Sequence, residues 1–284
     1  MRLAVQDHGG QGPTVLLVHG YPDDHHVWDL VVDRLLPDHR VVTYDVRGAG
    51  HSERPAGTAD YRLELLVTDI AAVIDDVSPD EPVHLVAHDW GSIQGWSAVV
   101  DGDVAKRIAG YTSMSGPGLD HVANWMAARR RPGLRRWGQA ARQGLHSWYI
   151  VAFHTPLAPR AFKAGLGRRW AKVLERSEGI RSTDGWPGDV TADAIAGMRL
   201  YRANIFRHRR NPNARTEVPV QLVIPTRDPY VGPRLLDGIE AIAPDLVRVE
   251  IDAKHWIPRS HPDEVARLIR AHVARVVERR GRTS

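Results

Sequence analysis

Three side chains in this sequence have the types and the spacing needed for covalent hydrolysis. Asp89 directly follows the apolar run at residues 83–87, inside the segment His88-Asp89-Trp90-Gly91. Small residues at Ala87 and Gly91 allow a strand to turn sharply into a helix, which would present the carboxylate above the sheet as a nucleophile. Taken alone, the segment fits the N-cap of the following helix equally well.

The acid and the base follow in chain order. Asp228 comes just after the apolar run at residues 220–224, and His255 just after the run at residues 247–251. Ligands of open α/β folds bind at the carboxyl ends of the strands, where these side chains would meet. A histidine oriented by an acid can activate water against an ester of Asp89. The order predicts a two-step covalent hydrolysis.

Two backbone N–H groups are candidates for stabilising the oxyanion of that second step. The segment His19-Gly20-Tyr21-Pro22 follows the strand-like run at residues 15–18, and its turn can present the N–H of Tyr21. The N–H of Trp90 would supply the second donor. The Gly-rich segment at residues 45–52 is interpreted as support for the site.

These positions require a sheet that brings them to one edge. Short apolar runs that do not alternate suit parallel strands buried on both faces, and they occur at residues 15–18, 41–44, 83–87, 107–112, 220–224 and 247–251. Helix-like stretches lie between them, at residues 28–36, 61–77, 92–100, 233–243 and 262–277. This alternation predicts a doubly wound, mostly parallel α/β sheet flanked by helices.

The alternation stops between residue 116 and about residue 215. This stretch has no strand-like run, is rich in Arg, Trp, Gly and Pro, and regains helical patterning at residues 148–153 and 193–206. We therefore predict an α/β core of residues 1–115 and 216–284. Residues 116–215 would form a helical cap, or lid, inserted between strands six and seven.

Composition excludes several classes of protein. None of the 284 residues is cysteine, so disulfides, thiolate catalysis and cysteine-ligated zinc are excluded. The net charge is +4, and the densest arginine cluster, at residues 129–136, has no nucleic-acid-binding module around it. We expect no nucleic-acid partner. The first residues lack the pattern of a secretory signal, and no apolar run reaches about 20 residues, so the expected location is cytoplasmic.

Together, the His-Gly-Tyr-Pro and His-Asp-Trp-Gly segments followed by Asp228 and His255 resemble the α/β-hydrolase superfamily, in particular its epoxide hydrolase branch. The resemblance covers nearly the whole chain and implies a reaction without metal or organic cofactor. No Gly-x-Ser-x-Gly segment occurs, so a serine esterase is not supported. Ser92 is interpreted as a residue of the first helical turn.

The cap carries the feature that points to epoxides. In epoxide hydrolases two cap tyrosines donate hydrogen bonds to the epoxide oxygen, and the segments that begin at Trp148-Tyr149 and Leu200-Tyr201 resemble theirs. A phenol with a pKa near 10 stays protonated at neutral pH and can protonate the alkoxide released by ring opening. The alternative is a pair of interior aromatics. Predicted substrate contacts are His19, Pro22, Trp148 and Trp256.

Two other functions stay open. A haloalkane dehalogenase shares the nucleophile, acid and base, and Trp90 is the residue type that such enzymes use to hold halide. They usually have His-Gly-Asn-Pro where this chain has Tyr21, and they give no reason for paired cap tyrosines. The second alternative is a module of this fold that binds a ligand without catalysis.

Two features concern the setting of the site. Lys254 stands where the superfamily commonly has Gly, so we expect a cation near His255 that lowers its pKa. Residues 113–121 resemble the hydrolase half of bacterial proteins in which such a domain precedes a short-chain dehydrogenase, and these are linked with lipid epoxides. The expected partner is a small hydrophobic epoxide. Peripheral contact of the basic cap with a membrane or lipid, and a homodimer, are compatible with the sequence.

Overall fold

The computed structural model describes residues 1–129, 138, 144, 147–180 and 188–283. In this part of the chain seven strands form one sheet with the order β1-β3-β2-β4-β5-β6-β7. The strands are β1 (Val5–Asp7), β2 (Thr14–Val18), β3 (Arg40–Tyr44), β4 (Val83–His88), β5 (Ile108–Met114), β6 (Val220–Pro225) and β7 (Leu246–Ile251). Only β1 runs antiparallel to its neighbour. The predicted α/β fold with a mostly parallel sheet is confirmed.

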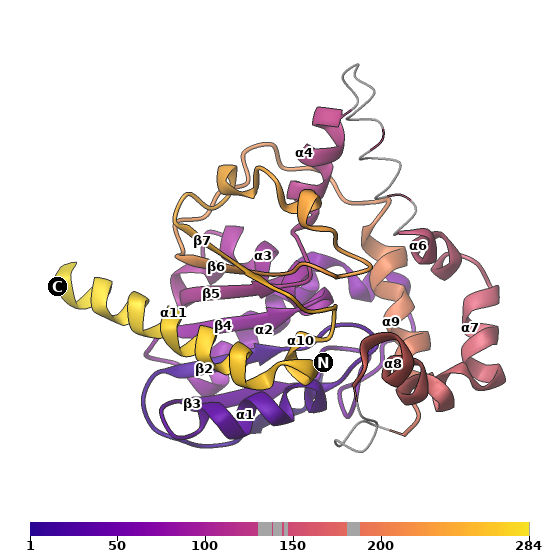
Figure 1. Cartoon of the computed structure of the whole chain (residues 1–284), viewed down its shortest axis with the longest axis horizontal. Coiled ribbons are helices and arrows are strands. Elements are labelled where there is room, and N and C mark those ends of the chain that lie inside the picture. The colour runs from indigo at the N-terminus through magenta and orange to yellow at the C-terminus, as the bar shows by residue number, and fades with distance from the viewer. Residues whose placement is uncertain (130–137, 139–143, 145–146, 181–187, 284) are drawn as a thin grey trace.

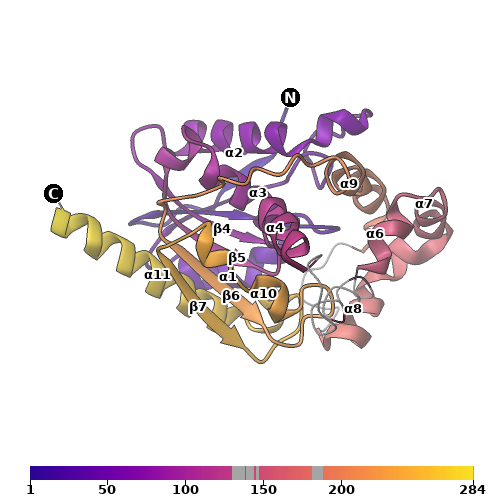
Figure 2. The same cartoon turned by 90° about the horizontal axis from the view of Figure 1, so that it is seen from above.

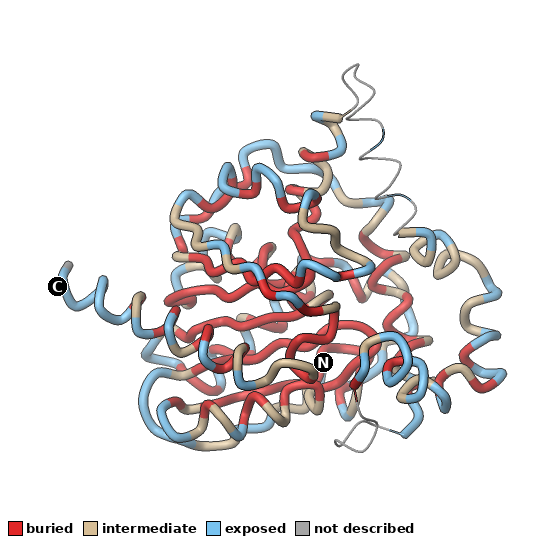
Figure 3. Tube along the Cα trace, in the orientation of Figure 1, coloured by how far each residue is buried: buried red, intermediate tan, exposed pale blue. Residues whose placement is uncertain are grey.

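The central strands are buried on both faces, as their continuous apolar sequences require (Figure 3). In β2, Leu16 and Val18 face the core that contains α2 (Leu63–Val77) and α3 (Trp90–Val100). Val15 and Leu17 face the other core, with α1 (Asp29–Leu35) and α11 (Pro262–Thr283). Alternate residues of one strand therefore anchor two helical layers.

The cap helices lie beyond the carboxyl ends of the strands, at the end of the molecule opposite the C-terminus (Figures 1 and 2). They are α6 (Trp148–Phe153), α7 (Leu157–Ala161), η4 (Phe162–Leu166), α8 (Trp170–Glu178) and α9 (Thr191–Asn204). Helix α4 (Leu119–Arg129), at the start of the predicted cap segment, lies nearer the middle of the molecule (Figure 2). The helices expected near residues 148–153 and 193–206 are α6 and α9. The proposed division of the chain at residues 116 and 215 stays a prediction, and residues 130–136 of the arginine cluster lie outside the described residues.

Three expectations about the elements were wrong. The helical cap is inserted between the fifth and sixth strands, β5 and β6, and not between the sixth and seventh. The numbering is lower because only one strand of the sheet, β1, precedes β2. The strand expected at residues 107–112 begins and ends later, at Ile108–Met114. The helix expected at residues 233–243 is two short 3-10 turns, η6 (Pro233–Leu236) and η7 (Ile239–Ala241), because Gly238 between them has a φ of 86°.

Among the described helices, none combines the length and the apolar character needed to cross a bilayer.

Candidate active site

Asp89 occupies a sharp elbow between β4 and α3. Its φ of 52° and ψ of −121° are strained for a residue with a side chain, a conformation that costs on the order of 1–3 kcal/mol. A Cβ on Gly91 would come within 2.3 Å of the Val18 carbonyl oxygen, so only glycine fits two residues after the nucleophile. Asp89 stands at the N-cap position of α3, yet its side chain makes no capping hydrogen bond. The helix-cap interpretation is therefore not supported.

The three predicted residues Asp89, Asp228 and His255 come together at the carboxyl ends of the strands. His255 Nδ1 lies 2.8 Å from Asp228 Oδ2, and His255 Nε2 lies 3.5 Å from Asp89 Oδ2. The other oxygen of Asp228 accepts hydrogen bonds from the N–H groups of Tyr230 and Val231, at 2.8 and 3.0 Å. Asp228 is thus held in one orientation and fixes the ring of His255.

Charges within this group reinforce one another. Burial opposes protonation of His255, but the carboxylates of Asp228 and Asp89 together raise its pKa well above the ordinary value. Burial likewise opposes ionisation of Asp89, yet the hydrogen bond and charge of His255 hold the pKa of Asp89 below its usual range. The mutual attraction of the two groups therefore favours an ionised carboxylate beside an imidazolium, which is the protonation state that a carboxylate nucleophile needs.

One predicted oxyanion donor already contacts the nucleophile. The backbone N–H of Tyr21 donates to Asp89 Oδ1 at 2.7 Å, which leaves Oδ2 directed toward His255. A Cβ on Gly20 would lie 2.4 Å from Asp89 Oδ1, so the turn approaches the carboxylate closely because residue 20 is glycine. The role of the Trp90 N–H stays a prediction.

His19 is not a substrate contact, so that expectation was wrong. Its Nε2 accepts from the Val46 N–H at 2.8 Å, and its Nδ1 lies 2.9 Å from the Gly20 carbonyl oxygen. The side chain is buried and does not line the cavity described below. Both ring nitrogens are used to tie the turn at Gly20 to the segment after β3, which places the N–H of Tyr21.

A cavity of about 250 Å³ lies above Asp89, between the core and the cap. Its walls are largely apolar and aromatic, and Asp89 and His255 are the ionisable acid and base that open into it. The lining includes the predicted residues Tyr21, Pro22, Asp89, Trp148, Tyr149, Tyr201, His255 and Trp256. Asp228 lies behind His255, and Trp90 lies behind Tyr201.

The two cap tyrosines face the same cavity from different helices. Tyr149 belongs to α6 and Tyr201 to α9, and their ring centroids are 6.0 Å apart at an interplanar angle of 85°. Burial raises the pKa of both phenols; the charge of Asp89 adds most to this for Tyr149, and the neighbouring Tyr149 and then Asp89 add to it for Tyr201. Both hydroxyls therefore stay protonated at neutral pH and can act as hydrogen-bond donors.

Several lining residues were not predicted. Tyr230 packs its ring 4.9 Å from that of His255 and 5.4 Å from that of Tyr149, and burial raises its pKa to about 12. Its position two residues after the acid Asp228 was a usable signal. The remaining residues of this kind are cap side chains whose direction no sequence pattern gives, namely Phe153, Phe162, Leu166, Trp170 and Val173.

The expectation that Lys254 lowers the pKa of His255 was wrong. The Lys254 ammonium donates to the Ser177 carbonyl oxygen, in the cap, and the pKa of His255 is raised instead. His88 has a structural role. Burial lowers its pKa to about 4, so it is neutral, and its Nε2 lies 2.9 Å from the His255 carbonyl oxygen.

Asp23 is a buried acid next to the site. Its Oδ2 accepts from the indole N–H of Trp256 at 2.9 Å, while its Oδ1 has no partner within the described residues. Burial raises the pKa of Asp23 to about 8, and the Trp256 hydrogen bond only partly opposes this. Asp23 is therefore neutral at pH 7 and holds a cavity wall in place.

The stability of Asp23→Asn relative to wild type is expected to be higher at pH 8 than at pH 4.5. The unfolded chain releases this proton near pH 4 and the folded protein only near pH 8, so wild-type stability falls as pH rises through that window. At pH 8 the proton retained on Asp23 costs wild-type folding on the order of 5 kcal/mol, whereas a poorly paired amide costs the variant about 1–3 kcal/mol at either pH. The Tm difference between variant and wild type, followed by calorimetry from pH 4.5 to 8, should grow by several degrees; a constant difference would contradict it.

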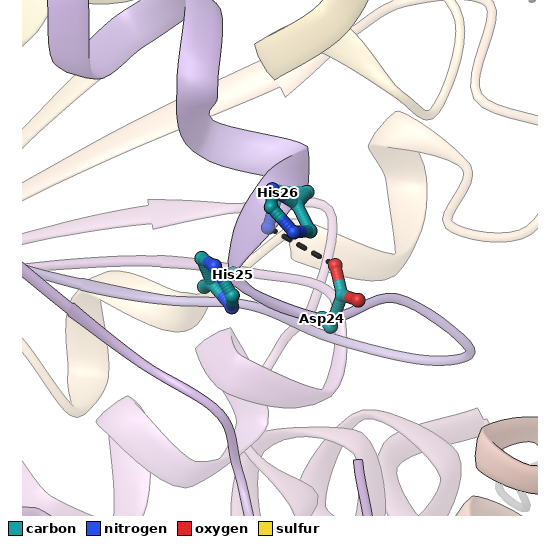
Figure 4. Close-up of side chains that lie close together, drawn as sticks. All are labelled: Asp24, His25 and His26. Carbon is teal, nitrogen blue, oxygen red and sulfur yellow. Dashed lines mark hydrogen bonds between the residues drawn. The ribbon is translucent and has the colours of Figure 1, made fainter. Parts of the chain in front are cut away.

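Asp24, His25 and His26 each offer one ligand-type atom within 4.8 Å of the others (Figure 4). All three are already engaged. Asp24 accepts from the His26 N–H at the start of η1 (His25–Trp28), and His25 Nδ1 lies 2.7 Å from Asp45 Oδ1. Hydrogen bonding to Asp45 raises the pKa of His25. We interpret the group as a structural link between η1 and the end of β3, and assign it no metal.

Comparison with known proteins agrees with this geometry. The alpha/beta hydrolase fold family matches residues 13–262. Probable oxidoreductase EphD of Mycobacterium tuberculosis is 38% identical over 95% of this chain and 47% of its own length. Epoxide hydrolase 3 of Xenopus tropicalis is 24% identical over 92% of this chain and 71% of its own. This chain thus spans about half the length of the EphD proteins that it matches.

Solved structures of similar fold include a variant of an epoxide hydrolase from Bacillus megaterium in complex with its diol product. It aligns with a TM-score of 0.77 and 26% identity over 96% of each chain. An epoxide hydrolase from Vigna radiata aligns with a TM-score of 0.73 and 24% identity, over 96% of this chain and 94% of its own.

Proposed function

Because this chain belongs to the α/β-hydrolase fold family, we propose that its cavity is the active site of an epoxide hydrolase that converts a hydrophobic epoxide to a vicinal diol. The observation that carries the proposal is the placement of Asp89 and two phenols on one apolar cavity. A nucleophile and a pair of weak acids are what the opening of a strained ether requires. The names of the relatives support the same activity.

In the first step Asp89 Oδ2 attacks an epoxide carbon, and the C–O bond of the ring breaks on the opposite side. Oδ1 stays on the Tyr21 N–H, so Oδ2 is the oxygen available for attack. Tyr149 and Tyr201 hydrogen-bond the leaving oxygen and supply its proton, giving a glycol monoester of Asp89. The ester carries no charge, so one of the two carboxylates that hold the proton on His255 disappears. His255 then gives up its proton, which in net terms replaces the proton that the phenols gave to the leaving oxygen.

In the second step neutral His255, oriented by Asp228, removes a proton from water, and the hydroxide adds to Cγ of Asp89. The N–H of Tyr21, joined by that of Trp90, stabilises the oxyanion at Oδ1. The ester bond then breaks, the diol leaves with the former Oδ2, and the proton on His255 neutralises its alkoxide. The carboxyl proton left on Asp89 passes to His255, which restores the resting pair of charges. One water and one epoxide are consumed for each diol.

The dehalogenase alternative gains no support. Trp90, the candidate halide contact, does not line the cavity, and its ring packs 4.8 Å from that of Tyr201. The deciding experiment incubates purified protein with styrene, terpene and fatty-acid epoxides, and separately with 1,2-dibromoethane. We expect diols from one or more epoxides and no bromide. Bromide release without diol would instead establish the dehalogenase.

Tyr149→Phe with Tyr201→Phe is expected to slow formation of the ester by about 10³-fold or more, because general acid catalysis contributes about 10²–10⁴-fold. Each phenylalanine keeps the ring and removes only the hydroxyl, so the apolar cavity is preserved. Hydrolysis of the ester, which does not use the phenols, should change little. Stopped-flow measurements of the two half-reactions test this; equal slowing of both would argue against a role at the epoxide oxygen. Tyr61→Phe, in the core away from the cavity, is the matched control.

A further inference from the structure

Charge is distributed unevenly between the cap segment and the rest of the chain. Residues 116–215 contain 19 of the 38 Lys and Arg residues but 6 of the 34 Asp and Glu residues, which gives this segment a net charge of +13. The remaining residues have a net charge of −9. A total of +4 therefore conceals a strongly basic cap on an acidic core.

The two groups of cations also differ in their partners. Many core arginines are paired with carboxylates, as in Arg40 with Asp7 and Arg47 with Asp69. In the part of the chain that the structure describes, nine exposed cap cations form no ion pair with a carboxylate. They are Arg160, Lys163, Arg168, Arg169, Lys172, Arg176, Arg207, Arg209 and Arg210. Their charge is available to an external anionic partner.

Exposed apolar side chains gather on the same part of the molecule. Six of the eight large hydrophobic residues that are exposed in the described chain belong to the cap, including Trp148 at 69%, Leu157 at 68% and Phe206 at 70% exposure. Trp148 and Val151 lie one turn apart on α6, and α6, α7, α8 and α9 form one end of the molecule in both views (Figures 1 and 2). Exposed tryptophan and aliphatic residues beside cations are typical of surfaces that enter a membrane interface.

We propose that the α6–α9 end of the cap docks on an anionic lipid bilayer. The cations would contact lipid headgroups, and Trp148, Val151, Leu157 and Phe206 would enter the boundary with the acyl chains. Trp148 also lines the cavity, so the docked face adjoins the entrance to the site and an apolar substrate can pass to it from the bilayer. A second copy of the chain is a poor occupant because two faces of the same positive charge repel. Nucleic acid would pair with the cations but would not bury the exposed apolar side chains.

The test is flotation of the full chain with vesicles of phosphatidylcholine alone or with about 30% phosphatidylglycerol. We expect binding to the anionic vesicles only, weakened at least about 10-fold when salt rises from about 0.02 to 0.3 M. Arg168→Gln/Arg169→Gln/Lys172→Gln should weaken it by about 100-fold. Lys106→Gln/Arg267→Gln/Arg282→Gln makes the same change of charge on the core and should leave binding unchanged. Val151→Ser/Leu157→Ser should weaken it by about 10-fold.

The proposal would be overturned by no binding to anionic vesicles, by equal loss in the cap and core variants, or by tighter binding to duplex DNA than to vesicles at the same salt. Sedimentation that shows a dimer broken by the cap variants would also overturn it. Docking does not depend on the reaction, so an inactive Asp89→Asn protein should bind vesicles like wild type. Failure of the proposed activity and failure of docking are thereby told apart.

Discussion

Asp89→Asn is expected to reduce epoxide turnover by at least about 10⁴-fold while the protein stays folded, because loss of a covalent nucleophile removes the reaction path itself. Asparagine preserves the size of the side chain and its acceptor for the Tyr21 N–H. It also tolerates the positive φ of 52° better than most residues. Steady-state assays on the best epoxide, together with thermal unfolding, measure both effects.

Oxygen labelling gives a second, independent readout of the same step. In one turnover of wild-type enzyme in H₂¹⁸O, label should enter the carboxylate of Asp89, and the first diol should carry the unlabelled Oδ2. Label found directly in that diol would mean that water attacks the epoxide, and Asp89 would then be a base instead of a nucleophile. Asp89→Gly is the control for the loss of turnover in Asp89→Asn. Glycine adopts a positive φ without strain, so a loss of turnover in this variant cannot be attributed to backbone strain at residue 89.

The positions of the catalytic candidates at strand ends were predictable because parallel strands end at the same edge of the sheet. Asp89, Asp228 and His255 each follow a buried apolar run, and parallel strands bring such positions to one edge of the sheet. The sequence could not decide whether Asp89 is a nucleophile or a helix cap. That choice depends on the direction of one side chain, which the φ of 52° and the Tyr21 hydrogen bond now support as the nucleophile.

The wrong predictions for the site share one physical cause. His19 and Lys254 were assigned from their neighbours in sequence, but long-range partners decide where they point: the Val46 N–H and the Ser177 carbonyl oxygen. The cap aromatics were missed for the same reason, since Phe162 and Trp170 meet the cavity only through helix packing. Residues placed by a strand end can be anticipated from one sequence, whereas residues placed by tertiary contacts cannot.

In the proposed mechanism, the position of His255 between two carboxylates changes its role from one step to the next. Asp89 and Asp228 both favour the imidazolium in the resting site, and a protonated ring cannot accept a proton from water. Once Asp89 is esterified, its charge is gone and the pKa of His255 must fall. In this mechanism the first step would therefore free the base, which is needed only in the second. Acid pH should slow hydrolysis of the ester more than its formation, which single-turnover measurements across pH can check.

His255→Gln is accordingly expected to stop the reaction halfway, with turnover reduced by about 10³-fold or more and the ester of Asp89 accumulating. Glutamine keeps a polar group near Asp228 but cannot take a proton from water. Intact-protein mass spectrometry should show one substrate mass added per chain, and peptide mapping should locate it at Asp89. The adduct must be missing from Asp89→Asn/His255→Gln and from His26→Gln, a half-exposed histidine outside the cavity. Continued diol formation by His255→Gln without an adduct would exclude both the covalent intermediate and the base assigned here.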